Sequence, residues 1–338
     1  MGGWAIFCAI CGGPFSSQVN IDPEGTDEDC YRDEVLRDFN LGWLDDLCAL
    51  GINPDAPGND KSFLTGVGGY FDYGAVEVVT GEDPNVPLQN NAHFIAYHDY
   101  AGIGDTREPH IFPFHPICYK DILQRCIYQG KSKQIRKDVL FDVLEDLNGG
   151  RYVRLQLIYG EPEPPADQIW YSNKGQEVLV ANPVRISKLD ADFDLIMKSL
   201  DKKAEQDQNP QDEDIFNKLS PELRHEVFKL LPAGSILALK AASLAMHTTT
   251  LSREFWKHRL RSEMPWLWEI HDIDVFQSQE LEDKTSKLLL DIQKKSQYTS
   301  KNDDYIFGLA NRRRIWGVCE QIQSRYLEKL KNISNTDS

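Results

Sequence analysis

Residues 215–260 read IFNKLSPELRHEVFKLLPAGSILALKAASLAMHTTTLSREFWKHRL. Ser220 is suited to cap a helix that begins at Pro221. A serine oxygen can accept a hydrogen bond from a backbone N–H of the first turn, and proline has no N–H that needs an acceptor. Leucine and valine then recur every three or four positions, as on one face of a helix. Ser235 and Ser252 can cap a second and a third helix in the same way. The stretch therefore predicts three short helices.

Helix-breaking residues separate the expected helices. Pro232 and Gly234 are expected to end the first helix before Ser235 begins the second. A unit of fewer than about 50 residues buries little apolar surface by itself. We therefore expect some of its apolar side chains to meet another surface.

The order of residues in this unit resembles an F-box, the motif that docks proteins onto the Skp-type adaptor of cullin-based ubiquitin ligases. Two positions depart from the family. Ser220 separates Leu219 from Pro221, where the family often has Leu-Pro, and 245–248 lacks the usual charged residue followed by an aromatic one. The alternative is an ordinary helical hairpin whose leucines form its own core. The resemblance rests on Leu219, Pro221–Leu223, Val227, Leu230–Pro232, Ile236–Leu237, Ser243 and Phe255–Trp256.

The resemblance implies a non-catalytic adaptor. Its partners would be a Skp-type adaptor protein, a cullin ligase reached through it, and a target protein held by the N-terminal part of the chain. The alternative function is a zinc-stabilised scaffold or interaction protein whose F-box-like unit acts outside a ubiquitin ligase. The expected docking surface, or the core beneath it, comprises Leu219, Pro221, Leu223, Leu230, Leu231, Pro232, Ile236, Leu237 and Trp256.

The cysteines indicate a second site near the start of the chain. There are 7 cysteines among 338 residues, and in a chain that looks intracellular they favour metal binding or burial over disulfides. Cys8 and Cys11 form a CxxC pair followed by two glycines, whose backbone freedom allows the tight turn of a zinc knuckle. This pair supplies half of a tetrahedral site.

His115 and Cys118 can supply the other half. Their three-residue spacing puts both on one side of a helical first turn, where Pro116 is tolerated. Four nitrogen and sulfur ligands would make a closed, structural zinc site. The alternative is that Cys8 and Cys11 are buried thiols and His115 is a turn histidine; His110 is a substitute ligand if the register differs.

Two resemblances support the zinc interpretation. A knuckle completed by two ligands from a helical first turn resembles a treble-clef zinc finger. Residues 114–119, FHPICY, resemble the FHPxCF element of fungal F-box proteins that also carry an N-terminal cysteine pair. These proteins also have an element like NRRRIW, here 311–316, which we expect to pack against the F-box or the N-terminal domain.

The pattern of elements predicts an α+β fold. A mixed N-terminal domain, held together by a treble-clef-like zinc site, is followed by a helical F-box and C-terminal helices. Residues 91–101 and 151–160 alternate like strands, and 138–147 are helical in pattern. We expect a mixed domain at 1–200, an acidic linker at 201–213, an F-box-like domain at 214–262, and a C-terminal helical extension at 263–338.

Several function classes are disfavoured. The net charge of −16 opposes nucleic-acid binding, since phosphates require a basic surface, and Arg312–Arg314 fits a solvated face or an internal salt bridge better. No GxSxG, HExxH, Walker or kinase motif points to an enzyme. No apolar run reaches the roughly 20 residues that a membrane span needs. The first residues lack a signal-peptide pattern, so we expect a cytoplasmic or nuclear protein with no membrane contact.

Overall fold

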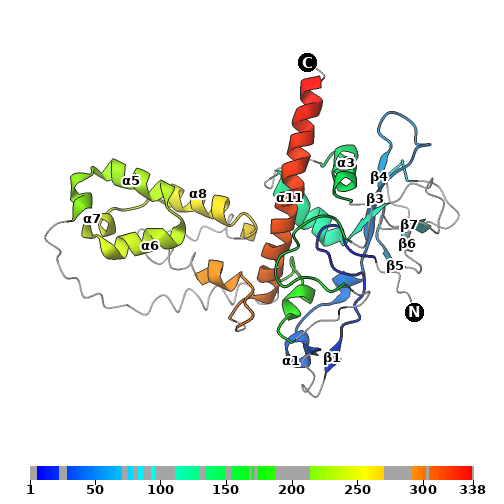
Figure 1. Cartoon of the computed structure of the whole chain (residues 1–338), viewed down its shortest axis with the longest axis horizontal. Coiled ribbons are helices and arrows are strands. Elements are labelled where there is room, and N and C mark those ends of the chain that lie inside the picture. Colours follow the sequence, from blue (N-terminus) through cyan, green and yellow to red (C-terminus); the bar gives the residue numbers. More distant parts are fainter. Residues whose placement is uncertain are drawn as a thin grey trace. The chain divides into compact units, whose positions relative to one another are not determined.

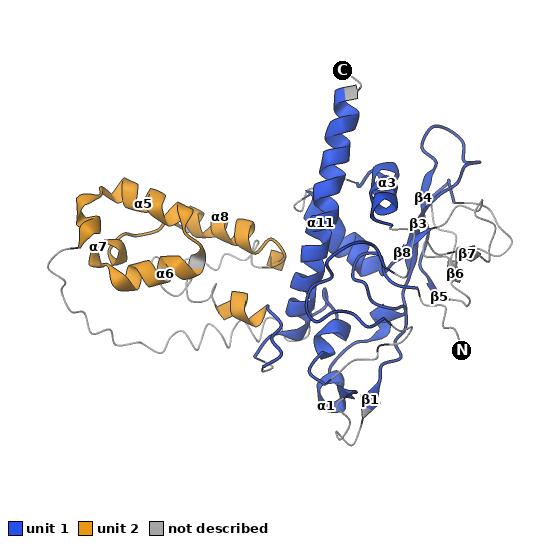
Figure 2. Ribbon diagram, viewed as in Figure 1, with its two compact units in different colours: residues 1–187, 297–338 blue, residues 188–296 orange. Residues whose placement is uncertain are grey.

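The chain folds into two compact units. The computed structural model (Figure 1) describes residues 6–22, 29–70, 75–78, 83–86, 93–95, 111–128, 134–148, 154–166, 170, 174–186, 214–269, 291–301 and 304–336. Unit 1 combines residues 1–187 with residues 297–338, and unit 2 comprises residues 188–296 (Figure 2). Unit 2 is therefore an insertion in the sequence of unit 1.

The core of unit 1 is a small antiparallel sheet. Strand β3 (Cys48–Ile52) lies between β4 (Ser62–Leu64) and β8 (Phe112–Phe114), with Leu50 opposite both Leu64 and Phe112. The first four residues of β3 are buried, as expected for a central strand of continuous apolar sequence. Helices and antiparallel strands together confirm the α+β class.

A second sheet and a strand pair complete the β structure of the described residues. Strands β5 (Gly68–Tyr70), β6 (Ala75–Val78) and β7 (His93–Ile95) form an antiparallel sheet in chain order. Strands β1 (Ile21–Asp22) and β2 (Tyr31–Arg32) pair in parallel, and helix α1 (Asp33–Leu36) follows them directly. Strand β7 confirms part of the strand expected at 91–101.

The strand expected at 151–160 is wrong for its described part, residues 154–160, which lie outside any strand. Their backbone groups bind elsewhere instead of forming a ladder. The Gln156 N–H donates to the Leu147 carbonyl at 2.9 Å, and the Ile158 N–H donates to the Gln321 side chain at 3.0 Å. The alternating pattern here reflects burial of Leu155 and Tyr159 beside exposed Ile158, without strand pairing.

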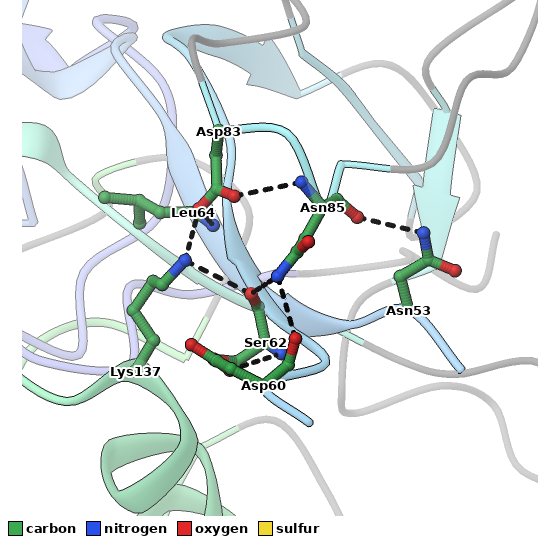
Figure 3. Close-up of polar contacts among 7 residues, drawn as sticks. All are labelled: Asn53, Asp60, Ser62, Leu64, Asp83, Asn85 and Lys137. Atoms are coloured by element: carbon green, nitrogen blue, oxygen red, sulfur yellow. Dashed lines mark hydrogen bonds and ion pairs between the residues drawn. The ribbon is translucent and has the colours of Figure 1, made fainter. Parts of the chain in front are cut away.

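Helix α3 (Lys137–Leu147) confirms the helix expected at 138–147 and packs on the sheet through the edge-on contact of Phe141 with Phe112. Lys137 fastens the start of this helix (Figure 3). Its Nζ donates to Asp83 Oδ2 at 2.6 Å and to the Ser62 carbonyl at 3.2 Å. Asn85 Nδ2 donates to the same Ser62 carbonyl at 3.1 Å. The network thereby joins β4 to α3.

Helix α11 (Phe307–Thr336) packs on α3, on α2 (Gln124–Tyr128), and on the turns η2 (Cys118–Leu123) and η3 (Glu177–Val180). It lies within the C-terminal helical extension expected at 263–338. Because α11 packs on elements of the N-terminal half, residues 297–338 belong to unit 1, whereas the four segments expected from the sequence placed 263–338 in one extension. None of the helices in the described residues is long and apolar enough to cross a membrane.

Unit 2 is helical in its described part, 214–269 and 291–296. Its elements are η4 (Ile215–Lys218), α5 (Pro221–Leu230), α6 (Ala233–Ala242), α7 (Leu244–His247) and α8 (Arg253–Glu263). Ser220 and Ser252 cap α5 and α8 as expected, accepting from the N–H groups of Leu223 and Phe255.

The start of the second helix differs from the expectation. Helix α6 begins at Ala233 with Pro232 as its N-cap residue, so Gly234 and Ser235 lie inside its first turn. The proline ring fixes φ near −65°, and with a ψ of 156° Pro232 is the extended residue that precedes the helix. Helix α7 was not expected; Ser243 caps it and accepts from the Met246 N–H at 3.0 Å. The acidic linker expected at 201–213 lies outside the described residues.

One buried ion pair ties η3 to β2. The Glu177 carboxylate is fully buried and accepts hydrogen bonds from Arg32 Nε and Nη2, both at 2.8 Å, and from the Arg32 N–H at 3.0 Å. Burial by itself raises the pKa of Glu177, but the hydrogen bonds from Arg32 outweigh it and hold this pKa below its usual value. The pair therefore contributes stability while the carboxylate is charged.

We predict that Glu177→Gln lowers the unfolding free energy of unit 1 by about 1.5–3 kcal/mol at pH 7, the range for hydrogen bonds to charged groups. Since the folded pKa is depressed, this contribution is complete above the usual glutamate pKa and disappears as the pH falls below it. Denaturant unfolding at pH 7 and pH 3 should therefore show a smaller difference in acid. Glu163→Gln is the control: its side chain is 78% exposed, 3.9 Å from Arg154, and should change little. Equal losses in both variants would contradict the prediction.

Candidate metal centre and candidate docking surface

Residues 8–13 form a tight knuckle. The Cys8 N–H donates to the Gly13 carbonyl at 2.8 Å, and the Gly12 N–H donates to the Cys8 carbonyl at 2.9 Å. The Cys11 N–H points at Cys8 Sγ at 3.4 Å. Gly12 has φ of +77°, a left-handed conformation that glycine adopts without strain. The turn therefore aims a backbone N–H at a sulfur, as the CxxCGG pattern predicted.

Two aromatic rings cover the glycines. A Cβ on Gly12 would lie 2.7 Å from the Tyr159 ring, and a Cβ on Gly13 would lie 2.1 Å from the Trp170 ring. Neither position has room for a larger side chain. The glycines are therefore required by packing as well as by the turn.

The second pair of residues comes from the end of β8. His115 follows the strand directly, and the Cys118 N–H donates to the His115 carbonyl at 3.0 Å as the chain enters η2. Turn η2 has the wide π-helical geometry, which occurs frequently at functional sites. The Ala9 N–H donates to the Pro113 carbonyl at 2.8 Å, so the knuckle is held directly against β8.

The four expected ligand residues converge. Cys8, Cys11, His115 and Cys118 are all buried, and their three sulfur atoms and one imidazole nitrogen lie within 4.8 Å of one another. Cys11 Sγ is 3.4 Å from His115 Nδ1, and the His115 N–H points at Cys8 Sγ at 3.4 Å. The cluster could hold a metal ion. The expectation that these four residues come together is confirmed, and the spare ligand His110 lies outside the described residues.

The imidazole of His115 is held from the side opposite the cysteines. Its Nε2 lies 3.3 Å from the Leu44 carbonyl, which can only accept, so Nε2 carries a proton and Nδ1 is the nitrogen that faces the sulfurs. The rings of Phe15 and Trp43 flank it at centroid distances of 4.6 and 4.9 Å. This arrangement fixes the tautomer that metal ligation by Nδ1 requires. No local pattern in the sequence indicates the contribution of Leu44.

The electrostatics of the cluster are those of closely coupled groups. Burial opposes charge on Cys11, but hydrogen bonds from Cys118 and Cys8 and the charge of His115 hold the pKa of Cys11 well below its usual value. Burial lowers the pKa of His115, yet the neighbouring Cys11 and Cys8 raise it to about 10. Burial raises the pKa of Cys118 well above its usual value. A metal ion entering this cluster would therefore displace protons, and its affinity should rise with pH.

The remaining cysteines do not join this cluster. Cys30, Cys48, Cys126 and Cys319 are buried thiols. Burial raises the pKa of Cys48, Cys126 and Cys319 above the ordinary thiol value. Such thiols behave as small apolar side chains.

The expected docking residues of unit 2 fall into three groups. Ile236 and Trp256 are buried, 0% and 2% exposed, and belong to the core of the unit. Leu219 and Leu231 are half-buried, and the side chain of Leu237 lies outside the described residues. The exposed members are Pro221, Leu223, Leu230 and Pro232.

The exposed leucines of α5 lie on one helix face. Leu223 is 54% exposed and Leu230 is 85% exposed. A separation of seven residues is close to two helical turns, so both side chains point the same way, with half-buried Val227 between them. We call Leu223, Val227 and Leu230 the α5 stripe. Ile215 and Leu244, 69% and 55% exposed, add to the apolar surface that unit 2 presents.

Comparison with protein-family models, with curated proteins and with solved structures gives no match. The resemblance of unit 2 to an F-box therefore stays a prediction.

Proposed function

We propose that Cys8, Cys11, His115 and Cys118 bind one zinc ion. Three thiolates and one imidazole are a donor set that zinc takes in structural sites. Zinc–sulfur distances of about 2.3 Å put the ligand atoms of a tetrahedron about 3.8 Å apart. The four atoms here lie within 4.8 Å of one another, so small side-chain movements suffice. The Leu44 carbonyl on His115 Nε2 supplies the outer hydrogen bond that such ligands usually have.

The zinc would be structural. Four protein ligands leave no open coordination position for water or substrate. A knuckle joined to the first turn of a helical segment is also the treble-clef arrangement, which we propose for this site. Its role would be to hold the N-terminal residues on β8 and η2.

We predict that the purified full-length protein carries about one equivalent of zinc, because one four-ligand site binds one ion. Cys8→Ser combined with Cys11→Ser should abolish it, since two of the four ligands are lost. Elemental analysis after dialysis measures this directly. Cys126→Ser combined with Cys319→Ser removes two buried thiols outside the cluster and should keep the equivalent. Absence of metal from the wild type, or its retention by the Cys8/Cys11 variant, would refute the site.

We further propose that the protein is a substrate-recognition adaptor of a cullin-based ubiquitin ligase. The observation that carries this proposal is the α5 stripe, where a leucine that is 85% exposed occupies a small helical unit. Burying a leucine contributes about 1.5–3 kcal/mol, so a folded unit that leaves two of them exposed on one face is suited to a partner. The order of residues around the stripe resembles that of an F-box, a motif whose partner is a Skp-type adaptor.

Unit 1 would hold the target protein. The adaptor itself would perform no chemistry; it would raise the effective concentration of its target near the ubiquitin-transfer centre. Unit 2 would then dock the ligase and unit 1 would bind the target, both within one chain. The alternative is that the protein is a zinc-stabilised scaffold whose F-box-like unit acts outside a ligase.

We predict that Leu223→Ser combined with Leu230→Ser weakens binding to a Skp-type adaptor by at least about 100-fold, because two buried leucines would be lost from the interface. Both side chains are exposed, so the variant should fold like the wild type. Calorimetric titration of the full-length protein with the purified adaptor measures the effect.

Ile158→Ser is the matched control, because this side chain is 78% exposed in unit 1 and its loss should leave the affinity unchanged. Undiminished binding by the leucine variant, or no binding by the wild type, would refute docking through the α5 stripe. Binding to the adaptor without recovery of a cullin would favour the scaffold.

A further inference from the structure

The element at 311–316, whose role the sequence left open, lies at the start of α11 and carries buried polar side chains. Asn311 and Arg312 are 0% exposed and Arg314 is 8% exposed. A buried guanidinium is costly unless its donors are satisfied and its charge is opposed. The partners of these three side chains therefore show what the element does.

Arg314 reaches the metal knuckle. Its Nη1 donates to the carbonyls of Cys11 and Tyr159, both at 3.0 Å. Its Nε and Nη2 donate to Asn311 Oδ1 at 3.2 and 3.0 Å. The guanidinium thus binds the main chain of Cys11, an expected metal ligand, and the main chain of Tyr159, whose ring covers Gly12.

The charge of Arg314 also suits this place. Three thiolates around a divalent ion leave one net negative charge in a buried site, and a single guanidinium balances it. Burial, together with the charge of Arg154, holds the pKa of Arg314 below its usual value, and interactions with Cys11, Cys118 and Cys8 oppose this lowering. The charge of the cluster and the charge of the arginine therefore stabilise each other.

Asn311 and Arg312 hold the segment that leads toward unit 2. Asn311 Nδ2 donates to the carbonyls of Leu179 and Ala181 at 3.2 and 2.8 Å. Arg312 Nε donates to the Pro183 carbonyl at 2.6 Å. A continuous set of hydrogen bonds therefore runs from Cys11 through Arg314 and Asn311 to Leu179 and Ala181, shortly before unit 2 begins at 188.

We propose that Arg314 is the positioning and charge-balancing residue of the metal centre, through which metal binding and the docking of the first turns of α11 become one coupled equilibrium. Metal binding would then strengthen the hold of α11 on residues 179–183, and docked α11 would raise the metal affinity by the same factor. The proposal requires a metal at the cluster and is independent of the ligase assignment.

The test uses the full-length protein with cobalt(II) as the metal, because cobalt bound to thiolates gives an absorption band that reports the site itself. Affinities follow from competition with a chelator. Arg314→Met, which keeps the apolar stem and removes the charge and the donors, should lose about 10- to 100-fold in affinity, the range for outer-sphere partners of metal ligands. Arg312→Met weakens only the hold of α11 on Pro183 and leaves the Arg314 contact with Cys11 in place, so its loss of affinity should be clearly smaller than that of Arg314→Met.

Arg314→Lys is a second variant that tests the proposal if Arg314→Met does not fold. Lysine keeps the charge and loses the planar fork that binds two carbonyls and Asn311 together. Its affinity should fall between those of the wild type and Arg314→Met. If the Arg314 variants lose no more than Arg312→Met, Arg314 is merely structural and the proposal is wrong.

The reciprocal measurement is hydrogen exchange with and without bound zinc. Removal of the metal should reduce protection of the amides at 308–318, and this dependence should shrink in Arg314→Met. Protection that is independent of the metal would also overturn the coupling. A wild type that binds no cobalt refutes the metal centre itself, whereas bound cobalt with equal affinities in Arg314→Met and Arg312→Met refutes only the role of Arg314.

Discussion

The contact between the knuckle at 8–13 and the end of β8 is the interaction on which unit 1 depends. It joins segments more than a hundred positions apart and buries three thiols and an imidazole in a space 4.8 Å across. Closing so long a loop costs entropy that grows only logarithmically with its length. Burying four polar groups without a ligand or water would cost folding free energy. As four ligands of one ion, they would instead hold the sheet, the knuckle and η2 together. We therefore regard this cluster as the structural centre of unit 1.

The long helix α11 joins the other end of the chain to unit 1. Because unit 2 is inserted between residues 187 and 297, unit 1 is complete only when α11 packs back on α3 and η2. Asn311 and Arg312 bind the main chain of 179–184, and Arg314 binds that of Cys11. These side chains satisfy buried carbonyls, which explains why strongly polar residues occupy the buried face of a helix. The basic triplet is thus internal, apart from half-buried Arg313.

The sequence predicted what depends on local spacing. Cys8 and Cys11 with two glycines, and His115 with Cys118, carry the two halves of the cluster in their spacing, and Ser220 and Ser252 cap helices as expected. The sequence did not predict features that depend on contacts with residues distant in the chain. Residues 154–160 alternate like a strand but bind Leu147 and Gln321 instead, and the roles of Leu44 and Arg314 depend on contacts that no local pattern records. Gly234 and Ser235 look like a helix break, yet Pro232 starts the helix earlier.

X-ray absorption at the zinc edge on the purified full-length protein tests the central claim most directly, because it reports the identity, number and distance of the donor atoms. The account predicts three sulfur neighbours at about 2.3 Å and one nitrogen at about 2.0–2.1 Å. A first shell of oxygen and nitrogen alone would contradict it, since the ion would then lie away from Cys8, Cys11 and Cys118.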